Sequence, residues 1–147
     1  MSLQTVVLNN GNQAIINTDT SKVFVWGKET QKETYTNSTG SEVTLTAGTL
    51  MGRISGTGLI VPLTSAAVDG SQYPIGIIIE DVVVPDTESR TVDLGVAGHV
   101  VRDKVVYQGA DVETTVVDGK QLRDRIMSDT KGILLVESGE QSATDNQ

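Results

Sequence analysis

The chain has 147 residues and a net charge of -8, from 11 basic and 19 acidic side chains. So few Lys and Arg residues, scattered along the chain, do not suit a nucleic-acid backbone or an anionic membrane, and we expect neither partner. The absence of cysteine excludes disulfides and cysteine-ligated zinc. Aromatic residues make up only 3% of the chain, so the core must consist of Val, Ile and Leu, which favour β-sheets.

Residues 1–44 are predicted to form an extended, β-prone N-terminal arm and a polar linker. The turn signal Asn-Asn-Gly-Asn at 9–12 separates the first two candidate strands. The polar run 28–40 contains few branched apolar residues, and we expect it to be a linker or an exposed loop. The N-terminus has neither a basic start nor a long apolar run, so we expect no signal peptide and no membrane span. Three short stretches of the arm are predicted strands: 5–8, 14–16 and 22–26.

Residues 45–136 are predicted to form a β-rich core in which glycines mark the turns. Two short strands, 49–51 and 58–61, flank a glycine-rich bend. The apolar run 75–84 is interrupted only by Glu80-Asp81, which indicates a strand, a bend and a second strand. Residues 89–96 alternate between polar and apolar side chains, as a half-exposed strand does.

The C-terminal part adds a helix to this β-rich pattern. A strand is predicted within 112–117 and another at 133–136, and residues 137–147 are predicted to be a flexible tail. A helix is predicted over 120–128, because Leu122, Ile126 and Met127 fall on or near one of its faces. We therefore expect a mainly β fold, a small domain with one or two short helices.

No residue pattern points to catalysis. His99 is the only histidine, and a surface or interface position is the expected one, with a small hydrolase built around it as the alternative. Glu80 and Asp81 would point to opposite faces of a strand, which favours a structural role at a strand end or bulge. The glycines at 48–58 lack the Lys-Ser/Thr ending of a phosphate loop. We expect no catalytic residues, no cofactor and no metal site.

The central block resembles the head decoration proteins of tailed bacteriophages, the lambda-type family. The resemblance covers about residues 45–106. Five segments carry it: Ala47–Arg53, Gly56–Gly58, Ala66–Gln72, Pro74–Val82 and Gly95–Asp103.

The resemblance implies a β-clip-like or barrel-like fold and a homotrimer that binds the major capsid protein. Members of this family sit on the outside of the DNA-filled capsid, bind after the shell expands and reinforce it against internal pressure. The expected location is therefore the virion exterior, after synthesis in the host cytoplasm. Family members also carry N-terminal arms that become ordered on the capsid, which agrees with the β-prone arm read from the residues.

Contact residues are predicted from their position in the chain. Apolar side chains on an arm need a surface to cover them, so Val6, Ile15, Phe24 and Trp26 are the expected capsid contacts. The expected trimer contacts are His99 and Arg102. Deletion of residues 1–27 is then expected to abolish capsid binding and to leave the central domain folded.

Two further structural readings remain open. A glycan-binding β-domain would present aromatic side chains to sugars, and a glycan array tests it. A tail or spike component would assemble into rings or filaments, whereas decoration requires closed trimers.

Overall fold

The computed structural model describes residues 3–7, 15–19 and 23–137, with side chains described from residue 23 to residue 137. The fold is mainly β, as the sequence predicts, with antiparallel pairing throughout most of it and one α-helix among the described residues. The elements in chain order are β1 (Leu3–Val7), β2 (Ile15–Asp19), β3 (Phe24–Thr36), β4 (Val43–Leu45), β5 (Leu50–Arg53), β6 (Ile60–Pro62), β7 (Pro74–Ile78), β8 (Val82–Val84), β9 (Ser89–Val101), the 3-10 helix η1 (Arg102–Lys104), β10 (Val116–Val117), β11 (Lys120–Gln121), α1 (Leu122–Asp129) and β12 (Gly132–Val136).

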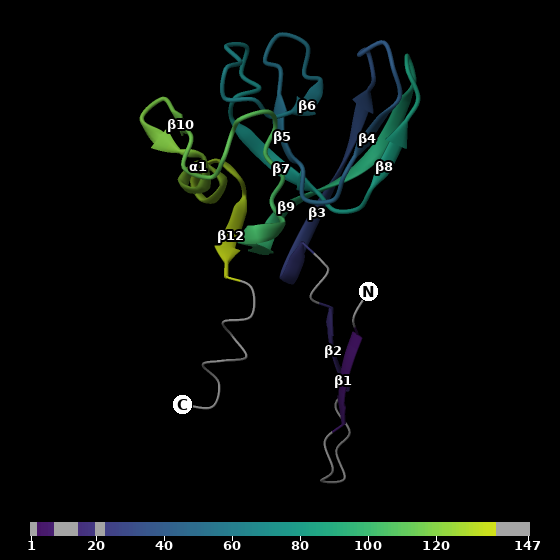
Figure 1. The fold of residues 1–147 in the computed structure, drawn as a ribbon, viewed down its shortest axis with the longest axis vertical. Helices are drawn as coiled ribbons and strands as arrows, with labels where there is room; N and C mark the ends of the chain where they lie inside the picture. The colour runs from purple at the N-terminus through teal and green to yellow at the C-terminus, as the bar shows by residue number, and fades with distance from the viewer. Residues whose placement is uncertain (1–2, 8–14, 20–22, 138–147) are drawn as a thin grey trace.

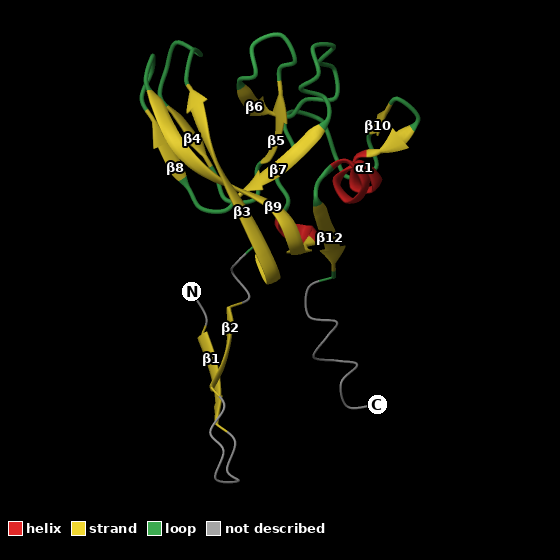
Figure 2. Cartoon of the chain, turned by 180° about the vertical axis from the view of Figure 1, so that it is seen from behind, coloured by secondary structure: helices red, strands yellow, loops and turns green. Residues whose placement is uncertain are grey.

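A six-stranded sheet organises the domain. Its order is β12-β9-β7-β5-β6, and β3 also pairs with β9. Strand β9 is antiparallel to β3 and β7 and parallel to β12, so it connects all parts of the sheet. The β4–β8 pair lies beside the long β3–β9 ribbon, and α1 lies on the other side of β5 and β7 (Figures 1 and 2).

The polar run 28–40 was expected to be a linker or loop, and this prediction was wrong. It supplies most of β3, which is paired with β9 over its whole length. One face of this ribbon is polar and exposed, and there Lys32 Nζ lies 3.0 Å from Asp93 Oδ1. The other face carries Tyr35, which is buried. The segment forms a strand although few of its residues are apolar. Its threonines and its tyrosine favour an extended backbone, and β9 supplies the hydrogen-bond partners and most of the apolar surface.

The core is divided between the two faces of β5 and β7. Leu50 and Ile77 belong to one apolar cluster, whereas their neighbours Met51 and Ile78 belong to the other. Neighbouring residues of a strand point to opposite faces, so both faces of these strands are buried. This arrangement accounts for the unbroken apolar run after Pro74. It also confirms the predicted strand, bend and second strand, since β7 and β8 are separated at Glu80-Asp81.

The predicted C-terminal helix is confirmed as α1. Leu122 and Ile126 are fully buried in the first cluster, whereas Met127 is 39% exposed and lies off the buried face. The predicted final strand is confirmed as β12. The strand expected within 112–117 is limited to the two residues of β10.

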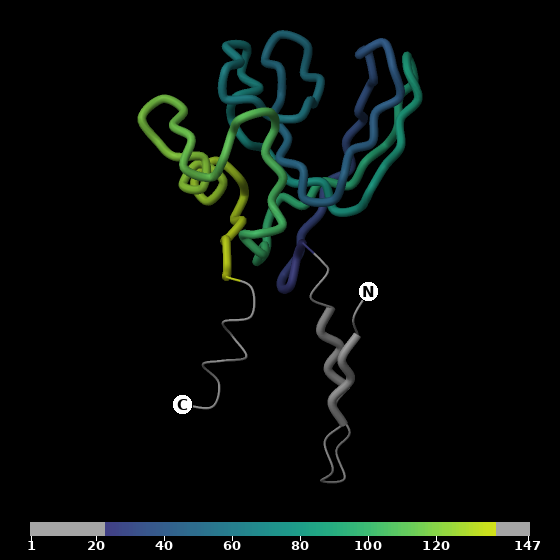
Figure 3. The backbone as a smooth tube through the Cα atoms, in the orientation of Figure 1, coloured from purple at the N-terminus to yellow at the C-terminus, as the bar shows by residue number. Residues whose placement is uncertain are grey.

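Of the three strands predicted in the arm, 5–8 and 14–16 correspond to the antiparallel pair β1–β2, in which Val6 is opposite Ile16, and 22–26 corresponds to the start of β3. The turn predicted at 9–12 and residues 138–147 of the predicted tail lie outside the described residues. The body of the chain begins at Val23 and ends at Glu137, and both points lie at the same end of the domain (Figure 3). The loops that connect β5, β6 and β7 lie at the opposite end. In the described ranges, no helix is both long and apolar enough to cross a membrane.

Candidate functional site

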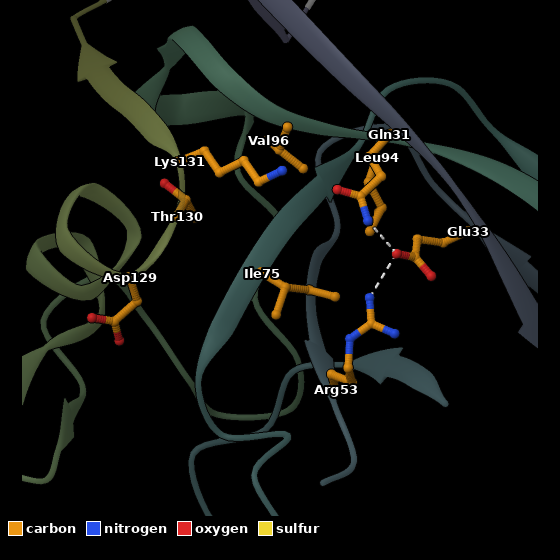
Figure 4. Close-up of a pocket in the computed structure, with 9 residues that line it drawn as sticks. All are labelled: Gln31, Glu33, Arg53, Ile75, Leu94, Val96, Asp129, Thr130 and Lys131. Atoms are coloured by element: carbon orange, nitrogen blue, oxygen red, sulfur yellow. Dashed lines mark hydrogen bonds and ion pairs between the residues drawn. The ribbon is translucent and has the colours of Figure 1, made fainter. Parts of the chain in front are cut away.

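A pocket of about 190 Å³ lies between the β3, β7 and β9 strands and the C-terminal end of α1 (Figure 4). Arg53 Nη2 and Gln31 Nε2 both donate hydrogen bonds to Oε1 of Glu33, each at 2.6 Å. Ile75 and its neighbours from β9 form the apolar part of the wall. Figure 4 shows Asp129 pointing away from the Arg53–Glu33 pair. The carboxylate of Glu33 is thus already paired, and the pocket holds no unpaired acid and base facing each other.

The neighbours of His99 across the sheet are apolar. It lies in β9 between β3 and β12, where its register neighbours are Trp26 and Leu134. Its Nδ1 is buried and has no hydrogen-bond partner. A general base must reach the proton that it removes through a hydrogen bond. Among the described residues, no group of three or more His, Asp or Glu side chains is arranged to hold a metal ion.

The Glu80-Asp81 pair lies at a strand end, one of the two positions that the sequence predicts for it. It separates β7 from β8. Asp81 Oδ1 accepts a hydrogen bond of 2.7 Å from the backbone N–H of Ala47, at the start of the loop that leads into β5. The carboxylate therefore holds two connecting segments together.

A row of three side chains crosses the sheet at the end where the body of the chain begins and ends. Trp26 is paired with His99, and His99 is paired with Leu134, so the three residues lie side by side on β3, β9 and β12. Residues in register on adjacent strands share one face of the sheet. Trp26 is 73% exposed and Leu134 is 50% exposed. We refer to Trp26, His99 and Leu134 as the apolar row.

The predicted capsid contacts are not all placed on this surface. Phe24 is only 8% exposed and belongs to the core, where its ring fills the space beside Gly95. Val6 lies in β1 and Ile15 in β2, and their side chains are outside the described part of the structure. Of the four predicted contacts, Trp26 is the one with a described, exposed side chain.

The two predicted trimer contacts lie in different surroundings. His99 is the centre of the apolar row, whereas Arg102 lies in η1 and is held by ion pairs with Glu113 and Glu137. The guanidinium donates two hydrogen bonds to the Glu113 carboxylate and one to Glu137. These hydrogen bonds raise the pKa of Arg102 and lower the pKa of Glu113. Arg102 thus joins η1 to the end of β12 within one chain.

Leu134 was absent from the predicted contacts, although its position carries a signal. The predicted strand 133–136 consists of four apolar residues, and alternate residues of a strand face opposite sides. Ile133 is fully buried, so its neighbour Leu134 faces outward. Sequence alone could not show that Leu134 lies next to His99 and Trp26, because the three residues come from distant strands.

The chain was compared with known protein families. The model of the family described as bacteriophage lambda head decoration protein D matches residues 16–124. The match is wider than the resemblance over 45–106, because it extends from β2 into α1. A search of curated proteins found no match.

Proposed function

Because the chain belongs to the family of bacteriophage lambda head decoration protein D, a structural capsid protein, we propose that it binds the outer surface of the expanded phage shell as a homotrimer and stabilises that shell against the pressure of packaged DNA. The family match over residues 16–124, well over half of the chain, carries this proposal. The partner is the major capsid protein.

Stabilisation follows from mass action. A protein that binds only the expanded shell favours that state by RT ln(1 + [L]/Kd), which is about 2.7 kcal/mol when its free concentration is 100 times Kd. A closed trimer engages three subunits of the shell together, so weak contacts add through avidity. The net charge of -8 per chain makes free trimers repel one another before they bind the shell.

The β1–β2 hairpin is the proposed grip on the shell. It forms a two-stranded sheet of its own, and such a hairpin is only marginally stable in water. Its outer edges carry backbone groups that can pair with a strand of another protein. Binding of the hairpin to an exposed edge of a capsid subunit would satisfy those groups and order the arm.

The test is to mix the purified protein with expanded and with unexpanded shells of the cognate phage and to image both. We expect closed trimers in solution and added density at the local three-fold positions of expanded shells alone. Equal decoration of both shells would contradict selectivity for the expanded state. Rings or filaments in the free protein would favour a tail or spike component.

A further inference from the structure

We propose that the apolar row of Trp26, His99 and Leu134 is a second docking surface for a capsid subunit, separate from the β1–β2 hairpin. This inference rests on the proposed function and assigns a described surface to it. The sequence assigned Trp26 to the capsid contacts and His99 to the trimer contacts, and it left Leu134 out of both. The register places Trp26 and His99 on one continuous surface, so both residues face the same partner.

Local backbone geometry presents Trp26 to the outside. The β3–β9 register shifts between Phe24 and Trp26 and again between Trp26 and Glu29. Such bulges redirect a side chain. Gly98 has a φ of +128°, and a Cβ at this position would lie 2.8 Å from the carbonyl oxygen of Trp26. The close approach of β3 and β9 at the row therefore depends on Gly98. This close approach holds the backbone of Trp26 in place.

The centre of the row contains an unsatisfied polar group. His99 Nδ1 is buried without a hydrogen-bond partner, between two apolar neighbours that are largely exposed. Buried polar atoms are normally paired. This atom is already shielded in the free chain, so a partner contacts the row mainly through the exposed side chains of Trp26 and Leu134. Interfaces use tryptophan as an anchor in this way.

The position of the row identifies its occupant. It lies at the end of the domain where residue 23 begins the body and residue 137 ends it, so the hairpin and residues 138–147 both attach there. The hairpin is the proposed grip on the shell, and the row continues that surface onto the domain. Residues 138–147, Ser-Gly-Glu-Gln-Ser-Ala-Thr-Asp-Asn-Gln, contain no large apolar side chain and are poorly suited to cover a tryptophan.

The first test uses two variants and a matched control. Trp26→Ala and Leu134→Ser remove exposed apolar groups of the row, whereas Val68→Ala removes one that is 94% exposed in the β6–β7 loop, at the opposite end. Binding to expanded shells is measured by co-sedimentation, and the oligomeric state and melting temperature are measured in the same preparations. We expect each row variant to lose at least tenfold in affinity, with its melting curve and oligomeric state unchanged, and Val68→Ala to bind like the parent.

The second test uses Trp26 as a spectroscopic probe, since it is the only tryptophan of the chain. Its replacement by 5-hydroxytryptophan allows selective excitation in the presence of capsid tryptophans. We expect the label to be quenched readily by acrylamide in the free protein and protected on expanded shells. Protection in the free protein would overturn the assignment to the capsid. If that protection were lost at low protein concentration, a second copy of the chain would be what covers Trp26. If it were lost on deletion of residues 1–22, the hairpin of the same chain would be what covers Trp26.

The outcomes separate this inference from the function on which it rests. If the parent decorates expanded shells and both row variants decorate them equally well, the docking surface is refuted and the proposed function stands. If the row variants dissociate the oligomer, the row is an interface between copies. If the parent does not bind expanded shells, the proposed function fails and the row loses its assigned partner.

Discussion

At the scale of single residues, two aromatic side chains two positions apart have opposite surroundings. Phe24 is 8% exposed, and Trp26 is 73% exposed. Gly95 makes the difference possible, because a Cβ there would lie 2.1 Å from the Phe24 ring. The ring occupies the space that a side chain on β9 would fill. Strict alternation along β3 would place both aromatics on one face, and the bulge between them separates their directions.

Truncation of these two aromatics should therefore have unequal effects on stability. Phe24→Ala leaves a cavity in the core and should lower the free energy of unfolding by about 3–5 kcal/mol. Trp26→Ala changes an exposed side chain and should stay within about 0.5 kcal/mol of the parent. Urea unfolding followed by circular dichroism measures both. Equal losses would show that Trp26 packs on the domain.

Asn37 is a second residue whose role only the fold reveals. It is fully buried, and its Nδ2 donates hydrogen bonds to the carbonyls of Ser41 at 2.7 Å and Val84 at 2.9 Å. Its Oδ1 accepts hydrogen bonds from the N–H and the hydroxyl of Thr39. One amide thus joins the turn after β3 to the end of β8.

Asn37→Ala should lower the free energy of unfolding by about 1–3 kcal/mol, since it leaves buried groups without partners. The neighbouring Ser38→Ala is the control, because Ser38 is exposed and its loss should change stability by less than about 0.5 kcal/mol. Thermal unfolding of both variants and of the parent measures these differences in stability. A stability of Asn37→Ala equal to that of the control would argue against this role.

At the scale of elements, local pattern predicted β7, β8 and α1 because their apolar residues are buried against several neighbours. It failed for β3, whose residues form a strand only because β9 is beside them. The join between η1 and β12 is likewise invisible in local sequence. It depends on Arg102, which pairs with Glu113 and with Glu137 across the ends of separate elements.

The pairing of Arg102 with Glu113 should make the free energy of unfolding depend on pH in the acid range. Hydrogen bonds from Arg102 lower the pKa of Glu113 below its ordinary value of 4.5, so the native state binds fewer protons than the unfolded chain. The stabilisation is fully present above the ordinary pKa and is lost as pH falls through the lower, folded pKa. Glu113→Gln should therefore be less stable than the parent at neutral pH.

The difference in stability between the parent and Glu113→Gln should narrow as the pH falls through the lowered pKa of Glu113, because the parent carboxylate then becomes protonated. Urea midpoints measured from neutral to acid pH test this dependence. Glu42→Gln, which changes an exposed glutamate before β4, is the control. A gap that stayed constant across this range would mean that the Arg102–Glu113 pair does not respond to protonation as its geometry predicts.

At the scale of the whole molecule, the boundary between arm and domain determines how the arm can be tested. Deletion of residues 1–27 would remove Phe24 from the core, so it would damage the domain as well as the arm. Deletion of residues 1–22 stops before the first core residue, Val23. It removes β1 and β2, which form a sheet of their own.

We expect the 1–22 deletion to keep the parent's circular dichroism spectrum and oligomeric state and to bind expanded shells at least tenfold more weakly. The 1–27 deletion should unfold at a lower urea concentration than the 1–22 deletion. Full occupancy of expanded shells by the 1–22 deletion, seen by imaging, would refute the role of the hairpin. Equal stability of the two deletions would contradict the place of Phe24 in the core.

The sequence by itself determined the mainly β class, the two strands that flank the glycine-rich bend, the helix α1 and the family. These features depend on spacing within a few residues, which local physical chemistry controls: alternation along a strand, the period of a helix, and the turns that glycine permits. Only the tertiary structure decided that residues 28–36 belong to a strand, that Phe24 is inside and that Trp26, His99 and Leu134 lie side by side. Each of these depends on the register between strands distant in sequence, where a one-residue shift would reverse which side chains face solvent.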